Sequence, residues 1–378
     1  MFQFKSDQYK NNLILKITAV FWIFTKLFSY NLWHSERLFP SVPPFEFLEN
    51  IPNYIHLALF FSALAGIAFV GFFQKNKFIL GITIIVEIAS CLLDQNRWQP
   101  WEYQYLLTFL FHFFYFKNQK QFVNYFSFLL IVIYLNSGLH KLNGSFLYVV
   151  WEQMILIKFF GFNSNQISNT FCHFVGLSLG FIEVTAALGC LFFKNKKIYA
   201  LLLIGMHLFI LILVSPIIGV NYNAIILPWN VLMIILILIV FYNNETSLSF
   251  NNLLKSFNII PFIILGILPF FCFLGLYDNF FSFNLYSGSL KYFRICVDEN
   301  RISPAYKQYF SNNKSFCGTK KVISGNDWSL KEMNVVIYPE VRFYKGIIEK
   351  WKEKNPNSEA EFYIYQYPFK AENFVEYK

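Results

Sequence analysis

FCHFVGLSLGFIEVTAALGCLFF spans residues 171–193, and IYALLLIGMHLFILILV follows it at residues 198–214 after a short basic turn. The hydrocarbon core of a bilayer is about 30 Å thick, so a helix that crosses it needs about 20 mostly apolar residues. Both runs come close to that length. They therefore predict two successive transmembrane helices.

The composition of the whole chain indicates the same surroundings. Of its 378 residues, 56% are apolar and only 14% are charged, whereas a soluble domain carries about a quarter charged residues. Residues 277–378 hold 15 of the 31 Lys and Arg and 12 of the 22 Asp and Glu. The chain therefore divides into a membrane domain, residues 1–276, and a polar C-terminal region, residues 277–378. The net charge of +9 comes without a basic stripe, so the bilayer and not nucleic acid is the expected partner.

Nine apolar segments approach the length of a membrane span. They lie at about residues 13–30, 53–73, 78–93, 102–116, 122–137, 171–193, 198–214, 224–242 and 258–276. The expected fold is an all-α polytopic membrane helix bundle of about nine transmembrane helices, with a small C-terminal α+β extramembrane region. The third to fifth segments are short and need flanking aromatic residues or a protein-lined cavity to span.

Basic residues alternate between the loops that join these segments. One side carries Lys5, Lys10, Lys75, Lys77, Lys117, Lys120, Lys194, Lys196, Lys197 and Lys255, and the other carries Arg37, Arg97, Lys141 and Lys158. The positive-inside rule then places the N-terminus inside and the C-terminal region outside. The abundance of Phe, Asn, Lys and Ile suggests an AT-rich bacterial genome, so the expected location is the bacterial cytoplasmic membrane, with the C-terminal region in the periplasm.

The C-terminal region has its own pattern. Alternating residues predict strands at 334–338 and 361–365, and charges at helical spacing between them predict a helix within 339–354. Cys296 and Cys317 are the cysteines of this region, and a disulfide between them is expected if it faces an oxidising compartment.

Ionisable side chains inside apolar runs are candidate functional groups, because burying them costs several kcal/mol unless they are paired or face water. Glu87, His112, Glu183 and His207 belong to this class. A structural role is the alternative for each: Glu183 could be satisfied by another helix, and His112 could pack at the interface. The two readings stay open.

Three polar stretches stand out from this background. The first is LLDQNRWQPWEYQY at residues 92–105, which offers Asp94, Arg97, Gln99 and Trp101 as substrate contacts. Its aromatic and charged residues would also fit a helix cap with an interfacial belt.

The second stretch is YLNSGLHKLNGSFLYVVWEQM at residues 134–154, with Asn136, His140 and Lys141 at the outer end of a span. A desolvated Lys can lose its proton near neutral pH and act as a base, and an adjacent His can relay that proton. Lys141 as an interfacial anchor is the alternative.

The third stretch, residues 205–234, contains His207 and then Asn221, Asn223, Trp229 and Asn230. Pro228 inside this apolar run should kink the helix and free a carbonyl, and broken helices with polar side chains often line a cavity. A kink that serves packing alone is the alternative.

The order of these features resembles the horizontally transferred transmembrane (HTTM) domain, the membrane portion shared by vitamin K-dependent gamma-carboxylases and many bacterial proteins. The likeness runs through YLNSGLHKLNGSF, HFVGLSLGFIEVTAALGCLFF and MHLFILIL, and it covers roughly residues 10–245.

This resemblance implies a role for Lys141, because a Lys in this segment is the base that deprotonates the reduced vitamin in the carboxylases. His140 stands where the family has the first Lys of a pair, and His112 is only a loose match to the family's catalytic His. Residues 277–378 are too short to be the large lumenal portion that positions the peptide. Peptide carboxylation therefore does not fit this chain, and chemistry on a quinone-like lipid stays open.

The resulting hypothesis is a membrane enzyme acting on a lipophilic, quinone-type substrate, with a quinone or vitamin K-like lipid as its cofactor. Lys141 would be the base, His140 the proton relay, and Asp94 with Arg97 would orient the substrate. A periplasmic or membrane redox protein would be a partner. The alternative is a non-catalytic membrane module, either an ion-coupled transporter or an anchor that presents the C-terminal region. The sequence shows no metal motif.

Overall fold

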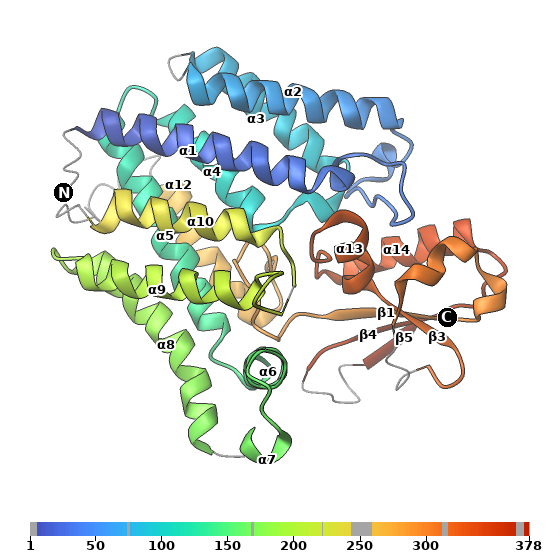
Figure 1. Ribbon diagram of the computed structural model, residues 1–378. Coiled ribbons are helices and arrows are strands. Elements are labelled where there is room, and N and C mark those ends of the chain that lie inside the picture. The colour runs from blue at the N-terminus through green and yellow to red at the C-terminus, as the bar shows by residue number, and fades with distance from the viewer. Residues whose placement is uncertain are drawn as a thin grey trace.

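The computed structural model describes residues 6–73, 76–167, 170–220, 222–242, 259–311, 317–367 and 374–377. Over these residues the chain forms a bundle of helices, followed by a part with a β-sheet that packs against one end of the bundle (Figure 1). In the described chain every strand lies at or after Tyr292. The expected combination of a helical body and a small C-terminal α+β region is therefore present.

The helices of the bundle follow one another with short connections. They are α1 (Asp7–Phe28), η1 (Tyr30–Trp33), η2 (Glu46–Leu48), α2 (Asn53–Phe72), α3 (Lys77–Leu92), η3 (Gln95–Arg97), α4 (Pro100–Phe114), α5 (Gln119–His140), α6 (Gly144–Phe146), η4 (Leu147–Phe159), α7 (Ser164–Ile167), α8 (Thr170–Phe192), α9 (Lys197–Val214), α10 (Ile226–Ile237), η5 (Leu238–Tyr242), α12 (Ile259–Pro261), η7 (Phe262–Ile267) and η8 (Leu268–Leu274). Ser6, Asn76 and Asn118 begin α1, α3 and α5 with a side chain that accepts a backbone N–H.

Five of these helices are long and apolar enough to cross a membrane: α1, α2, α5, α8 and α9. The other four predicted spans are helical as well but shorter. α3 and α4 have 16 and 15 residues, and the remaining two are the apolar stretches Ile226–Tyr242 and Ile259–Leu274. All nine predicted segments therefore fold as helices, and by length and composition five of them qualify as spans.

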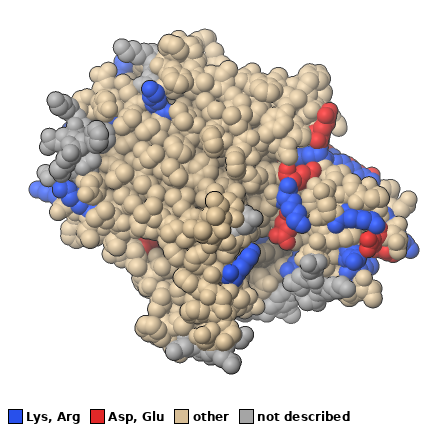
Figure 2. Space-filling view, in the orientation of Figure 1, with Lys and Arg blue, Asp and Glu red and all other residues tan. Residues whose placement is uncertain are grey.

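The distribution of charge on the surface agrees with this length criterion. In the view of Figure 2 the middle of the bundle is largely uncharged, whereas charges of both signs gather on the C-terminal part and Lys or Arg side chains lie toward the opposite end of the bundle. Many large apolar side chains of the long helices are exposed, among them Phe72, Phe181 and Leu208. An apolar belt of this kind suits contact with lipid tails.

One long helical stretch of the described bundle lies outside the nine predicted segments. α6 and η4 together cover Gly144–Phe159, and the polar residues Glu152, Gln153 and Lys158 interrupt this stretch, so it does not read as a span. In Figure 1 α6 is seen end-on while α9 and α10 run across the view, so this helix begins across the direction of those two.

The C-terminal part docks on one end of the bundle through hydrogen bonds to four separate connections. Asn31 Nδ2 donates to Glu332 O at 2.8 Å, Ser145 Oγ donates to Tyr367 O at 2.6 Å, and Asn326 Nδ2 donates to Tyr222 Oη at 2.7 Å. The fourth connection contains Asp94 to Gln99 and is described below. Burial raises the pKa of Tyr222 to about 12, so its hydroxyl stays neutral. These four connections are the ones that the charge pattern assigns to the side opposite the Lys-rich loops.

The sheet of the C-terminal part is five-stranded and antiparallel, in the order β2-β3-β1-β4-β5. Its strands are β1 (Tyr292–Val297), β2 (Phe310–Ser311), β3 (Lys321–Ser324), β4 (Glu361–Tyr365) and β5 (Phe374–Tyr377), and its helical segments are η9 (Glu299–Arg301), η10 (Pro304–Tyr309), α13 (Gly325–Met333) and α14 (Val341–Lys354). α14 buries Phe343, Tyr344, Ile347, Ile348 and Trp351 along one face. The strand at 361–365 and the helix within 339–354 are confirmed.

The expected strand at 334–338 is wrong. Asn334 adopts a left-handed conformation with φ 59° and ends α13, and the residues that follow it form no strand in the described chain. Side chains satisfy this backbone instead, since Tyr338 N donates to Asn96 Oδ1 at 2.7 Å and Val335 O accepts from Ser329 Oγ at 2.8 Å. Residues 335–338 are buried between the bundle and the C-terminal helices, and this burial on both sides accounts for the apolar pattern that resembled a strand.

The expected disulfide is present. Cys296 in β1 is bonded to Cys317, which precedes β3, and their Cα atoms are 5.5 Å apart. Both cysteines are buried beside Val322. The bond closes a loop of 21 residues and ties that loop to the central strand of the sheet.

We expect the double substitution Cys296→Ser and Cys317→Ser to destabilise the C-terminal part by about 3 kcal/mol, because a cross-link over a loop of roughly 20 residues restricts the unfolded chain by that amount. The measurement is the temperature at which protease first cleaves this part in the full protein, with and without dithiothreitol. Reductant should lower that temperature in the wild type but not in the double variant. Cys172→Ser removes an unpaired cysteine and serves as the control; identical temperatures for wild type and double variant would contradict the expectation.

Candidate functional site

A cavity of about 440 Å³ lies among α5, α8, α9 and α10, and Phe283, Leu285 and Tyr286 line it from the segment that leads to the C-terminal part. This volume is in the range of ligand-binding pockets. Most of its lining is apolar. The polar side chains that line it are Tyr134, Ser137, Lys141, Glu183, His207, Trp229, Asn230 and Tyr286.

Lys141 and Glu183 form an ion pair at the edge of this cavity. Lys141 Nζ contacts Glu183 Oε2 and also donates to Ser137 Oγ at 2.8 Å. The side chains are 14% and 3% exposed. A charged pair that is removed from water needs this close geometry, because the loss of hydration of both ions must be offset by their attraction.

Two glycines bring the pair together. A Cβ atom on Gly180 of α8 would lie 2.9 Å from the carbonyl oxygen of Gly138 in α5, so only glycine allows the two helices to approach this closely. Lys141 follows Gly138 at the end of α5, and Glu183 lies one turn after Gly180. The small residues therefore fix the distance between the two charges.

A second polar chain faces the same cavity. Asn230 Nδ2 donates to Ile226 O at 2.8 Å, so Asn230 Oδ1 is turned toward His207 Nδ1 at 2.6 Å. His207 Nδ1 then carries the hydrogen, and its Nε2 accepts from Tyr134 Oη at 2.7 Å. This assignment gives a neutral imidazole whose basic nitrogen is held against a phenol.

The cavity is open on the side of α8 and α9. Ile182, Leu201 and Leu202 line it and are 41%, 49% and 39% exposed. The Cβ position of Gly205 has no atom within 4 Å, which shows that the space beside α9 is empty of protein. A molecule can therefore enter between these two helices from the apolar surface of the bundle.

The sequence identified several members of this site. Lys141, Glu183, His207, Trp229 and Asn230 all line the cavity, although the sequence assigned them to separate groups. Tyr134 was missed as a functional residue. Its signal was its position seven residues before Lys141 in α5, which puts both side chains on one face of the helix.

Other candidates from the same stretches lie elsewhere. His140 is stacked on Phe273 with ring centroids 4.3 Å apart and does not line the cavity. Asn136 is buried and donates to Val132 O at 3.0 Å. Asn223 does not line the cavity itself, but it donates to Tyr286 Oη at 2.5 Å and so holds a lining residue. Asn221 lies outside the described residues.

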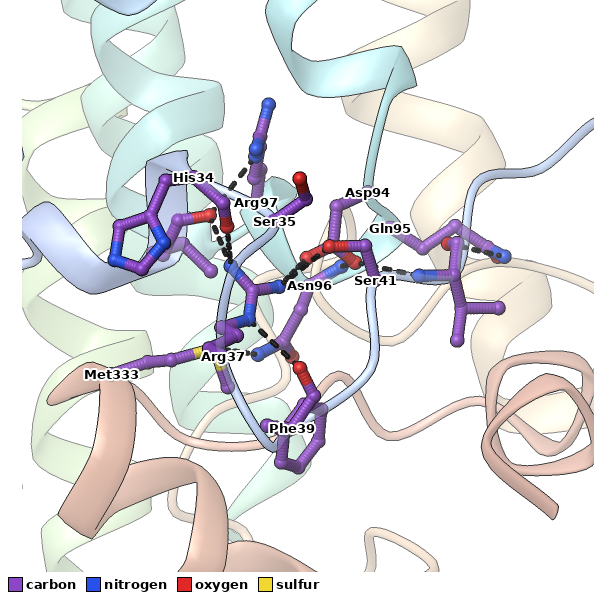
Figure 3. A network of polar contacts seen from close by, with 12 residues as sticks. His34, Ser35, Arg37, Phe39, Ser41, Asp94, Gln95, Asn96, Arg97 and Met333 are labelled. Atoms are coloured by element: carbon purple, nitrogen blue, oxygen red, sulfur yellow. Dashed lines mark hydrogen bonds and ion pairs between the residues drawn. The ribbon is translucent and has the colours of Figure 1, made fainter. Parts of the chain in front are cut away.

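The first polar stretch was expected to contact the substrate, but Asp94, Arg97, Gln99 and Trp101 do not line this cavity. Arg37 points at Asp94 and forms an ion pair with it, while Asn96 reaches toward Met333 of the C-terminal part (Figure 3). Gln99 Nε2 donates to Val336 O at 3.0 Å. These polar groups seal the junction between the two parts of the chain.

Arg97 and Trp101 complete this structural region. Arg97 is buried and donates to the carbonyl oxygens of Ser90 and Leu32 at 2.7 and 3.1 Å, and its Nη2 lies 2.8 Å from His56 Nδ1. Trp101 is 1% exposed in the core. The amides and charges therefore serve as caps and as a dock, because Asp94, Asn96, Arg97 and Gln99 are buried and some of them bond to the C-terminal part.

Two further intramembrane candidates are also distant from the cavity. Glu87 pairs with Lys26 at 2.6 Å, and His112 packs against Phe116 and Phe122. Ligand atoms of Glu87, Cys91 and Glu102 lie within 4.8 Å of one another. The ammonium of Lys26 already supplies positive charge at this cluster, so we assign no metal there.

Comparison of the chain with protein-family models, with curated proteins and with solved structures finds no match in any of the three.

We expect Lys141→Met and Glu183→Gln each to destabilise the protein by about 3 kcal/mol, because each leaves one buried charge without its partner. The double variant should be more stable than the sum of the two changes implies, since no unpaired charge remains. Thermal unfolding of the purified proteins measures both effects.

The exposed pair Arg301 and Glu359 provides the control. Arg301→Met and Glu359→Gln should change stability by about 0–1 kcal/mol, as surface pairs do. Strictly additive effects at Lys141 and Glu183 would show that the two charges do not depend on each other.

Proposed function

We propose that this chain is an integral membrane protein whose cavity binds a lipophilic molecule with a hydroxyl or carbonyl head group and moves a proton at that group. The observation that carries the proposal is the meeting of a buried Lys141–Glu183 pair and a neutral Tyr134–His207–Asn230 chain at one apolar cavity. The opening between α8 and α9 supports a ligand that arrives from the bilayer. A quinone-type lipid has this combination of an apolar body and oxygen atoms.

Lys141 and Glu183 would share the proton transfer. Transfer of one proton from Lys141 Nζ to Glu183 Oε2, which it contacts, would give a neutral amine that can accept the proton of a bound hydroxyl. The new ammonium then lies beside the oxygen anion and stabilises it.

His207 would take the relay role that the sequence assigned to His140. Its Nε2 is hydrogen-bonded to Tyr134, and both side chains line the cavity, whereas His140 lies against Phe273. Tyr134 can pass its hydroxyl proton to His207 Nε2 and take up the proton of a ligand hydroxyl in its place. The resemblance to the HTTM domain supports Lys141 as the base in the same segment.

The placement in the membrane is part of the proposal. The N-terminus would be inside, the C-terminal part outside, and all nine segments would cross or enter the bilayer. Two observations support this arrangement. The loops with few Lys residues gather where the C-terminal part docks, and that part carries a disulfide, as proteins in oxidising compartments do. A bacterial cytoplasmic membrane, with a periplasmic or membrane redox protein as partner, fits this placement.

The second candidate is a non-catalytic membrane anchor that presents its C-terminal part to a partner. The buried hydrogen bonds of Asn96 and Gln99 to that part favour it, because they hold the two parts in one fixed arrangement. The contents and chemistry of the cavity distinguish the candidates, since an anchor needs neither.

We expect organic extracts of the protein, purified in mild detergent, to contain a quinone-type or similarly oxygenated lipid in stoichiometric amount. Gly205→Phe should reduce this amount by about tenfold or more, because the new ring fills space that the ligand needs. Mass spectrometry of the extract is the measurement. Gly205→Ala adds one methyl group and is the matched control. Equal lipid content in both variants would contradict the assignment of the cavity.

We also expect the cavity to ionise a bound phenol. A nitrophenol with an alkyl chain is the probe, and its visible absorption reports the phenolate. Binding to the wild type should lower the apparent pKa of the probe by about one unit or more, whereas Lys141→Met should bind the probe without this shift. Lys158→Met removes a nearby cation outside the cavity and is the control. A shift that persists in Lys141→Met would remove Lys141 from the chemistry.

A further inference from the structure

A second and separate cavity lies on the other side of the bundle. Its volume is about 570 Å³, and it shares no lining residue with the cavity that contains Lys141. This cavity is a groove. α3 and α4 form its lower wall, on the side of the bundle, and the segment Gly275–Phe281 and the start of α14 form its upper rim, on the side of the C-terminal part. It therefore lies where the bundle meets the C-terminal part.

The lower wall of this groove is apolar. Ile88 of α3 and Leu106, Leu107 and Leu110 of α4 line it. Leu276 lies on the rim and is 72% exposed. A wall of this composition along two helices suits a hydrocarbon chain.

Aromatic rings form the middle of the groove. Trp98 stacks on Tyr103 with ring centroids 5.2 Å apart, Tyr103 contacts Phe281 at 4.7 Å, and Phe281 contacts Tyr277 at 5.8 Å. All four rings line the cavity. Trp and Tyr are typical of the level at which lipid head groups begin, and their faces attract ammonium groups.

The rim of the groove carries charges of both signs: Asp278, Glu340 and Arg342. Asp278 is used within the protein, because its Oδ1 accepts from Phe281 N at 2.8 Å and its Oδ2 accepts from Tyr338 and Arg342. Glu340 Oε1 accepts twice from Asn279, at 2.9 and 3.0 Å.

The other carboxylate oxygen of Glu340 forms a looser contact with Arg342. Glu340 Oε2 lies 3.8 Å from Arg342 Nη1, beyond hydrogen-bond distance. Arg342 Nε and Nη2 are engaged by Gln95 and Tyr338 at 3.0 and 2.6 Å, so the guanidinium is held in place with Nη1 at the rim. Burial raises the pKa of Glu340, and an adjacent ammonium would offset that penalty.

We propose that this groove binds a phospholipid with a zwitterionic, primary-amine head group of the phosphatidylethanolamine type. An acyl chain would lie along Leu106, Leu107 and Leu110. The phosphate would accept from Arg342 Nη1, and the ammonium would donate to Glu340 Oε2 against the face of an aromatic ring. The proposal depends on the membrane placement given above, but not on the chemistry at Lys141.

The test is a competition among lipids of defined composition. The full protein is delipidated in mild detergent, equilibrated with equal amounts of phosphatidylethanolamine, phosphatidylglycerol and phosphatidylcholine, and isolated again, and the retained lipids are quantified by mass spectrometry. The wild type should retain phosphatidylethanolamine in about fivefold excess or more, because only this head group combines a phosphate with N–H donors.

Two variants address the site itself. Arg342→Gln removes the phosphate contact, and Leu107→Trp fills the apolar wall without removing a hydrogen bond; both should return the retained lipids to the equal input ratio. Lys345→Gln removes a positive charge on the same helix away from the groove and should keep the excess. Preference for phosphatidylglycerol, an equal ratio in the wild type, or an unchanged excess in Leu107→Trp would overturn the proposal.

The lipid in the first cavity separates this test from the proposed function. Arg342→Gln and Leu107→Trp should leave the oxygenated lipid bound near Lys141 in place, and Gly205→Phe should leave the phosphatidylethanolamine excess in place. Loss of both lipids in every variant would indicate unfolding and would count against the local role of Leu107.

Discussion

Burial of charge in an apolar bundle is the constraint on which the rest of this structure depends. An ion that is moved out of water into surroundings of low polarity loses several kcal/mol of hydration, and a close partner has to offset that loss. Three pairs meet this need between segments that are distant in sequence: Lys26 with Glu87, Arg37 with Asp94, and Lys141 with Glu183. Each pair fixes how two parts of the chain must meet.

The three pairs differ in what surrounds them. Lys26 is fully buried with its ammonium 3.1 Å from the centre of the Trp33 ring, and the Arg37 pair is covered by the C-terminal part. The pair of Lys141 and Glu183 alone among these three lines a cavity. A filled environment leaves a charge pair with a structural role, whereas an apolar cavity beside the pair leaves room for a ligand.

The two sides of the bundle contain different cavities. On one side, glycines at 138 and 180 draw α5 and α8 together and place the charged pair beside the chain of Tyr134, His207 and Asn230. On the other side, leucines of α4 and charges near α14 form a groove at the junction of the two parts. The docked C-terminal part supplies residues at the rim of this groove, so its position on the bundle helps to form the groove.

The sequence by itself determined the nine apolar helices of the bundle, the helix and one strand of the C-terminal part and the cysteine pair, because apolar length, periodicity and residue chemistry are local properties. Only the tertiary structure decided which polar groups share a space. Asp94 and His140 carry the same chemistry as Glu183 and His207, yet they are covered by packed residues. Partners and cavities arise from contacts between segments far apart in the chain, and the spacing of residues along one segment does not encode those contacts.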